Sequence, residues 1–130
     1  MNENIPQQRM VPFTKPTLSG NELNAMREAF NEKNFASDGS FSKLAEANIE
    51  KITTARRARV LNSCTSALET TMLALDLAAG DEVILPSFNF PSAANAVCLR
   101  GAVPVFVDID PLTMNIDTEL IEAAITKKTR

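Results

Sequence analysis

Residues 83–92 read Val-Ile-Leu-Pro-Ser-Phe-Asn-Phe-Pro-Ser, and this stretch decides the fold. Its first three residues form a continuous apolar run, which is typical of a parallel strand covered on both faces. Pro86 ends this strand, and the pattern predicts a helix over 91–99. A second apolar strand is expected over 103–107, where Pro104 favours its beginning or an edge position. Strand, helix and strand in this order predict a parallel sheet with a right-handed crossover.

A second turn comes earlier in the chain, where residues 62–69 read Asn-Ser-Cys-Thr-Ser-Ala-Leu-Glu. We expect a short strand over 60–62 before it and a helix over 66–77 after it, apolar nearly all round and buried on more than one side. The first N–H groups of a helix are unpaired and carry the positive end of its dipole, so an anion is stabilised there. The hydroxyls that could complete the shell of a phosphate belong to Ser63, Thr65 and Ser66. The alternative is a capping box, in which Ser66 and Glu69 satisfy backbone donors only.

These two turns are predicted to meet at one edge of the sheet. Ligands of such sheets bind outside the carboxyl ends of the strands, and both turns leave strands at that end. An aromatic residue between a strand and a helix, such as Phe90, is either part of the core or a platform for a flat ring. The residues therefore indicate a place for a phosphorylated, flat, aromatic ligand, with core packing of Phe90 as the alternative.

The remaining elements flank this central part. Residues 1–18 are expected to form an extended arm, followed by a helix to about Glu32 that begins with the capping box Ser19 to Glu22. A turn over 35–40 and a helix over 41–53 come next. The sequence ends with a helix over 120–126, for which Asp117 is the predicted cap.

Composition excludes several classes of function. The chain has 130 residues, 45% of them hydrophobic and 22% charged, which is usual for a soluble globular domain. A net charge of −3 offers no basic surface for nucleic acid. The sequence predicts neither a membrane span nor a secretory signal, so a cytoplasmic location is expected. Histidine is absent, which argues against a zinc site at Cys64 or Cys98, and Cys98 is expected to be buried as a small hydrophobe.

The two turns, together with 105–110 and 114–117, resemble the pyridoxal-phosphate (PLP)-dependent sugar aminotransferases of the DegT/DnrJ/StrS family. The likeness runs from about Val11 to Arg130 and is strongest to the branch of transaminases that makes dTDP-4-amino-4,6-dideoxygalactose. It implies an α/β fold: part of the large domain of a fold-type-I PLP-dependent transferase, three-layer α/β/α with a mainly parallel sheet. In these terms 1–18 is the amino-terminal arm, and 19–130 is an incomplete, truncated portion of the PLP-binding domain.

The resemblance also implies a cofactor site. The family's Gly-Thr-x-Ala-Leu turn holds the PLP phosphate and corresponds to residues 64–68, so Cys64, Thr65 and Ser66 are expected to bind it. Phe90 corresponds to the aromatic residue that stacks on the pyridine ring. This sequence departs from the family pattern at three positions, namely Cys64 in place of Gly, Asn89 in place of Thr and Pro91 in place of a small or β-branched residue.

A substrate contact is implied for one further residue. The loop that contains Asp38 lies near the substrate in relatives, so Asp38 is a candidate for a contact to the sugar or to a partner subunit. An Asp-Gly turn nevertheless needs no function to explain it, and a turn remains the alternative.

The family's catalytic groups are expected outside this sequence. PLP enzymes use a lysine that forms a Schiff base with the cofactor and an acidic residue that pairs with the pyridine nitrogen. The family places both beyond residue 130, so we expect no catalytic residue here and no transamination by these 130 residues alone. The implied whole enzyme is a homodimer that transfers an amino group from glutamate to a nucleotide-linked 4-keto-6-deoxy sugar. The alternatives are a sugar dehydratase that uses the same cofactor and a truncated, non-catalytic remnant.

Overall fold

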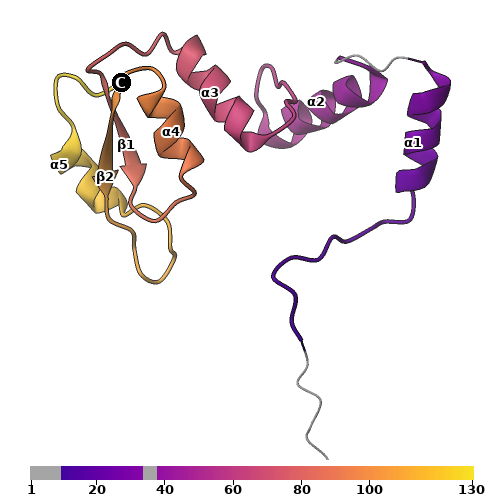
Figure 1. Ribbon diagram of the computed structural model, residues 1–130, viewed down its shortest axis with the longest axis horizontal. Helices are drawn as coiled ribbons and strands as arrows, with labels where there is room; N and C mark the ends of the chain where they lie inside the picture. Colours follow the sequence, from indigo (N-terminus) through magenta and orange to yellow (C-terminus); the bar gives the residue numbers. More distant parts are fainter. Residues whose placement is uncertain (1–9, 34–37) are drawn as a thin grey trace, which may run out of the picture. The chain divides into compact units, whose positions relative to one another are not determined.

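The computed structural model describes residues 10–33 and 38–130 of the chain (Figure 1). The chain divides into two compact units, Met1–Val60 and Leu61–Arg130. The first contains the helices α1 (Glu22–Asn31) and α2 (Ser40–Thr53), and the second contains the sheet. None of the helices in the described residues combines the length and the apolar character needed to span a bilayer.

The amino-terminal segment has no regular secondary structure over residues 10–18, and its side chains are exposed. Residues 1–9 of the predicted arm and residues 34–37 of the predicted turn lie outside the described residues. The predicted capping box forms only by half. The carboxylate of Glu22 accepts hydrogen bonds from the N–H groups of Ser19 and Gly20, but the Ser19 hydroxyl accepts from Asn21 instead of Glu22. The helix consequently starts at Glu22, with Asn21 as its N-cap.

The Glu22 carboxyl makes the start of α1 sensitive to pH. The Ser19 N–H hydrogen bond is the largest cause that lowers the pKa of Glu22 from 4.5 to about 2. Because the pKa is depressed in the folded state, the stabilisation is complete above pH 4.5 and is lost as the pH falls towards about 2. We predict that the carboxyl carbon of Glu22 titrates near pH 2 in an NMR experiment, and that Glu22→Gln abolishes the accompanying loss of α1 helicity. Titration at an ordinary glutamate pKa would contradict this.

The second unit is built around two parallel strands, β1 (Glu82–Pro86) and β2 (Val103–Val107). Ile84 pairs with Val105 in their register, and α4 (Ser92–Cys98) connects the strands. The predicted strand, helix and strand are therefore confirmed. The strand pair lies between α4 and α5 (Ile121–Ala124), which are on opposite sides of it (Figure 1).

The end of the described chain runs beside the start of β1. The N–H of Glu82 donates to the carbonyl of Lys128 at 2.9 Å, and the N–H of Arg130 donates to the carbonyl of Glu82 at 3.0 Å. Thr129 thereby forms a parallel bridge with Glu82. Residues 128–130 lie on the opposite edge of β1 from β2, since β2 occupies the other edge.

The core of this unit is made by α4, the helix α3 (Cys64–Ala74) and the segments next to the strands. Val97 is 0% exposed and Leu77 is 1% exposed. The buried cluster consists of Met72, Leu77, Ala96, Val97 and Ala102, and the partly buried Leu68, Val83 and Leu85 pack against it. Small residues on α4 allow this helix to lie close to the sheet.

The strand predicted over 60–62 is wrong. Its residues have no regular secondary structure, and the N–H of Val60 donates at 3.1 Å to the carboxylate of Glu46, on α2. Arg59 also binds Glu46, at 2.9 Å, and Glu46 is buried. A strand needs a neighbouring strand to pair its backbone groups, and a buried carboxylate takes that place here.

The helix predicted over 66–77 both starts and ends earlier. Asp76 has a φ of +51°, and the N–H groups of Asp76 and Leu77 donate back to the carbonyls of Leu73 and Met72. This is a Schellman arrangement, which ends α3 at Ala74 and turns Leu77 into the core. The expectation of burial on more than one side is also wrong, because Leu73 and Leu75 are exposed among the described residues.

Two further expectations have different outcomes. Cys98 is exposed instead of buried, because the buried face of α4 consists of Ala93, Ala96 and Val97, and both cysteines are free thiols. Asp117 caps the last helical segment as predicted, with its carboxylate accepting from the N–H of Glu119 at 3.0 Å. That segment is a 3₁₀ turn, Thr118–Leu120, followed by α5, and it ends two residues before the predicted position.

We predict that Leu77→Ala lowers the free energy of unfolding by about 3 kcal/mol, because it removes a fully buried side chain and leaves a cavity. Leu112→Ala is the matched control, since Leu112 is 92% exposed and its truncation should change little. Urea denaturation followed by circular dichroism measures both. Equal midpoints for the two variants would show that Leu77 is not part of the core.

Candidate functional site

A hollow of about 680 Å³ lies at the carboxyl end of β1. The strand ends at Pro86, and the following Ser87 donates its N–H to the carbonyl of Val107 at 2.8 Å. The chain then turns outward to α4, and the wall is completed from the segment after β2. The lining residues are Pro86, Phe88, Asn89, Phe90, Pro91, Met114, Asn115 and Ile116. The lining carries no formal charge, so this hollow suits a neutral group.

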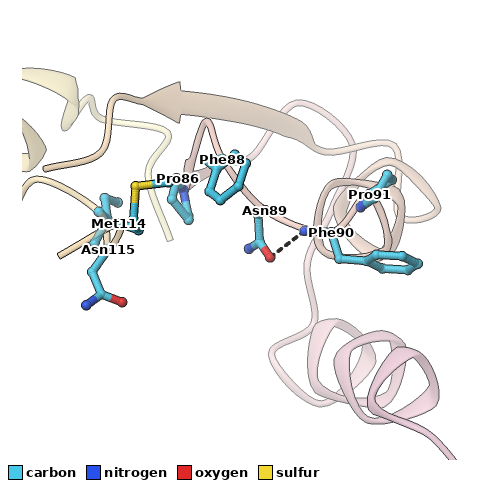
Figure 2. Close-up of a pocket in the computed structure, with 8 residues that line it drawn as sticks. Pro86, Phe88, Asn89, Phe90, Pro91, Met114 and Asn115 are labelled. Atoms are coloured by element: carbon cyan, nitrogen blue, oxygen red, sulfur yellow. Dashed lines mark hydrogen bonds between the residues drawn. The ribbon is translucent and has the colours of Figure 1, made fainter. Parts of the chain in front are cut away.

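Phe90 is not a core residue. Its side chain is 74% exposed, and its N–H donates to the Asn89 carboxamide oxygen at 2.7 Å. Figure 2 shows the Phe90 ring pointing away from Phe88 and Met114. The ring also borders a second hollow, of about 250 Å³, together with Asn95 and other residues. Phe90 therefore offers a free aromatic face, as a platform for a flat ring requires.

The turn before α3 is capped by Ser63. The Ser63 hydroxyl accepts a hydrogen bond from the N–H of Ser66 at 3.1 Å and contacts the Ser66 hydroxyl at 3.0 Å. The capping box with Ser66 as the cap is therefore wrong, because Ser66 lies inside the first turn of the helix. The N–H groups of Cys64 and Thr65 have no acceptor among the described residues. These are the donors that a helix start leaves for an anion.

Thr65 borders a third hollow, of about 390 Å³, between α3 and α4. Ser92 and Asn95 of α4 line the same hollow, and Glu69 lies one turn further along α3. The two sequence motifs are thus brought together, but not for the predicted reason. The strand over 60–62 is absent, and the packing of α3 on α4 brings Thr65 close to the segment that follows Phe90.

This arrangement fits a phosphorylated ring. The Cys64 and Thr65 N–H groups and the Thr65 hydroxyl are donors that match phosphate oxygens. The carboxylate of Glu69 would repel an anion bound deeper in the third hollow, so the favourable position for a phosphate is the helix start. Phe90, whose side chain is exposed, offers a face on which a flat ring can stack.

Asp38 belongs to the first unit. Its φ is +67°, and its carboxylate lies 3.7 Å from the ammonium group of Lys43, with both side chains exposed. This geometry is that of a turn with a surface ion pair, and its role in binding a substrate stays a prediction.

Among the residues that line the hollows, sequence reasoning did not single out Asn95, Met114 and Asn115 as site residues. One of them could have been found from helical spacing, since Asn95 follows Ser92 by three positions on the predicted helix. Residues 114–117 carried the family resemblance, but nothing in their pattern indicated that Met114 and Asn115 line the site, because a loop brings them to the carboxyl end of β1.

Comparison with known proteins identifies the class. Residues 16–130 match the DegT/DnrJ/EryC1/StrS aminotransferase family, and the chain belongs to this family. The structure has the fold expected of the amino-terminal part of a fold-type-I PLP-dependent aminotransferase.

Three solved structures illustrate the likeness. Spr1654 of Streptococcus pneumoniae, classed as a sugar aminotransferase and solved in its PMP (pyridoxamine-phosphate) form, is 32% identical with a TM-score of 0.81, over 92% of this chain and 30% of its own. The aminotransferase TlmJ of Streptoalloteichus hindustanus is 34% identical with a TM-score of 0.79, over 93% and 33%. The E. coli GDP-4-keto-6-deoxy-D-mannose-3-dehydratase with bound hydrated PLP is 28% identical with a TM-score of 0.81, over 92% and 32%. The chain spans about a third of the length of these proteins.

The cap at Ser63 can be tested by stability. We predict that Ser63→Ala lowers the free energy of unfolding by about 1 kcal/mol, because the N–H of Ser66 loses its acceptor. Ser66→Ala is the matched control and should cost clearly less, since the Ser66 side chain accepts no hydrogen bond from a backbone N–H of residues 10–33 and 38–130. Urea midpoints measure both changes. A larger loss in Ser66→Ala would restore Ser66 as the cap.

Proposed function

We propose that this chain is the phosphate-binding part of a PLP-dependent aminotransferase that transfers an amino group from glutamate to a nucleotide-linked 4-keto-6-deoxy sugar. The observation that carries the proposal is the start of α3, where the N–H groups of Cys64 and Thr65 lack acceptors in the described structure. The helix α4 packs against α3, and the exposed Phe90 lies just before α4 in the chain. Family membership and relatives solved with PLP or PMP support it.

In this proposal Thr65, Ser66 and the Cys64 backbone hold the cofactor phosphate, and Phe90 stacks on the pyridine ring. PLP, when bound, supplies the electron sink for amino transfer. The small side chains of the turn let the phosphate approach the backbone closely. The Cys64 side chain is exposed and therefore does not have to occupy the space of the phosphate.

The remaining parts of the whole enzyme are also proposals. We propose that the lysine and the acidic residue that the family uses with this cofactor lie beyond residue 130. The whole enzyme is proposed to be a cytoplasmic homodimer, and Asp38 is proposed to contact the sugar or the partner subunit.

A second candidate function is dehydration of a nucleotide-linked keto sugar. The likeness to the E. coli dehydratase supports it, since the TM-score of 0.81 equals that of Spr1654, although the identity is 28% against 32%. The side chain at the cofactor lysine position of the whole enzyme separates the two, because a lysine there is required for amino transfer and is replaced in the dehydratases.

We predict that pyridoxamine 5′-phosphate (PMP) raises the melting temperature of the purified protein, because a ligand that binds only the folded state stabilises it by about 2.7 kcal/mol at one hundred times its Kd. PMP is preferred to PLP because it has no aldehyde to react with surface lysines. The double variant Thr65→Ala, Ser66→Ala should lose most of this increase, and Thr70→Ala, also on α3 but beyond its first turn, should keep it. A folded protein whose melting temperature does not respond to PMP would overturn the proposal and favour the non-catalytic remnant.

A further inference from the structure

Asn95 occupies a particular face of α4. Ala93, Ala96 and Val97 of this helix are buried against the sheet and the core. Ser92 and Asn95 are three residues apart and therefore lie next to each other on a different face of α4. Both border the hollow that contains Thr65. Asn95 is exposed, so its side chain is accessible to a ligand in that hollow.

Asn95 also connects the two halves of the candidate site. It lines the hollow that contains Thr65 and the hollow that contains Phe90, and it is the residue that these two linings share. If the phosphate of a ligand lay at Thr65 and its aromatic ring lay on Phe90, the Asn95 side chain would lie beside the part of the ligand that links phosphate and ring.

The Asn95 carboxamide has no structural task in the described part of the chain. No described residue forms a hydrogen bond with it, whereas the Asn95 backbone groups pair normally with Pro91 and Leu99. Asparagine is also a poorer helix former than the alanines around it. Its NH₂ group is therefore a free donor.

A free neutral donor matters here because positive side chains are missing. Among the residues that the structure describes, no lysine or arginine lines either hollow, and Glu69 adds a negative charge to the hollow of Thr65. A phosphate at the start of α3 would therefore be bound by neutral N–H and O–H donors alone. The N–H groups of Cys64 and Thr65 are too few for all the phosphate oxygens, so further donors are needed.

We propose that Asn95 is a cofactor-binding residue whose carboxamide NH₂ donates a hydrogen bond to the phosphate held at Cys64 and Thr65. This inference rests on the proposed function and extends the phosphate site from α3 to α4. It adds to the motif a residue that lies on a different helix.

The test measures binding of PMP by isothermal titration calorimetry. Asn95→Ala should raise the Kd about tenfold, the loss expected for one hydrogen bond to a charged group. Asn95→Asp, which has the same shape, should raise it about a hundredfold, because a carboxylate would face the phosphate. Thr70→Ala is the control and should leave the Kd unchanged, since Thr70 lies on α3 beyond its first turn and lines neither hollow.

Pyridoxamine, which lacks the phosphate, separates this contact from a general effect on the site. Its Kd should be the same in the wild-type protein and in both Asn95 variants. The inference would be overturned if the Asn95 variants bound pyridoxamine and PMP with equally raised Kd values, or if Asn95→Asp bound PMP as tightly as the wild-type protein does. In both cases Thr65→Ala should still raise the Kd for PMP. Absence of PMP binding to the wild-type protein would instead overturn the proposed function. Circular dichroism and melting temperatures confirm that each variant is folded.

Discussion

The packing of α4 against β1 and β2 is the contact on which the rest of the second unit depends. Val97 and Ala96 are removed from water there, together with Leu77 and Ala102, and this burial is the main apolar contribution to the unit. With one face of α4 fixed on the sheet, its amino-terminal end lies at the carboxyl end of β1. The loop with Phe90 has to lie at that end, and Asn95 has to lie outside the core.

The helix α3 is held differently at its two ends, and this difference suits it for binding an anion. At its carboxyl end, the turn at Asp76 directs Leu77 into the core and anchors the helix. At its amino-terminal end, Ser63 accepts from one backbone donor, and the first two N–H groups have no acceptor in the part of the chain that the structure describes. The fixed end keeps those donors in place, so a phosphate would meet preorganised N–H groups and would not have to order a loop.

Much of the fold could be predicted from local patterns. The strands around Ile84 and Val105 are apolar runs, each preceded by a glycine, and Pro86 ends the first of them. This pattern predicted their positions and the helix between them correctly. The site could be predicted in part, since the turn at 62–66 and Phe90 carry the family motif. The strand over 60–62 could not be excluded from the sequence, because a short apolar run does not show that a buried Glu46 binds its backbone. The choice of Ser63 over Ser66 as the cap was equally hidden, because both serines fit a helix start.

The sequence by itself determined where β1, α4 and β2 lie in the second unit, because hydrophobic runs and chain-breaking residues act over a few neighbours. It also carried the chemistry of the turn at Thr65 and the aromatic side chain of Phe90. Only the tertiary structure decided which faces of the helices meet. It exposed Phe90 and Cys98, and it brought Asn95 to both the Thr65 hollow and the Phe90 hollow. The reason is that contacts between α3, α4 and the sheet join residues that are far apart in the chain, and no local pattern records which of them touch.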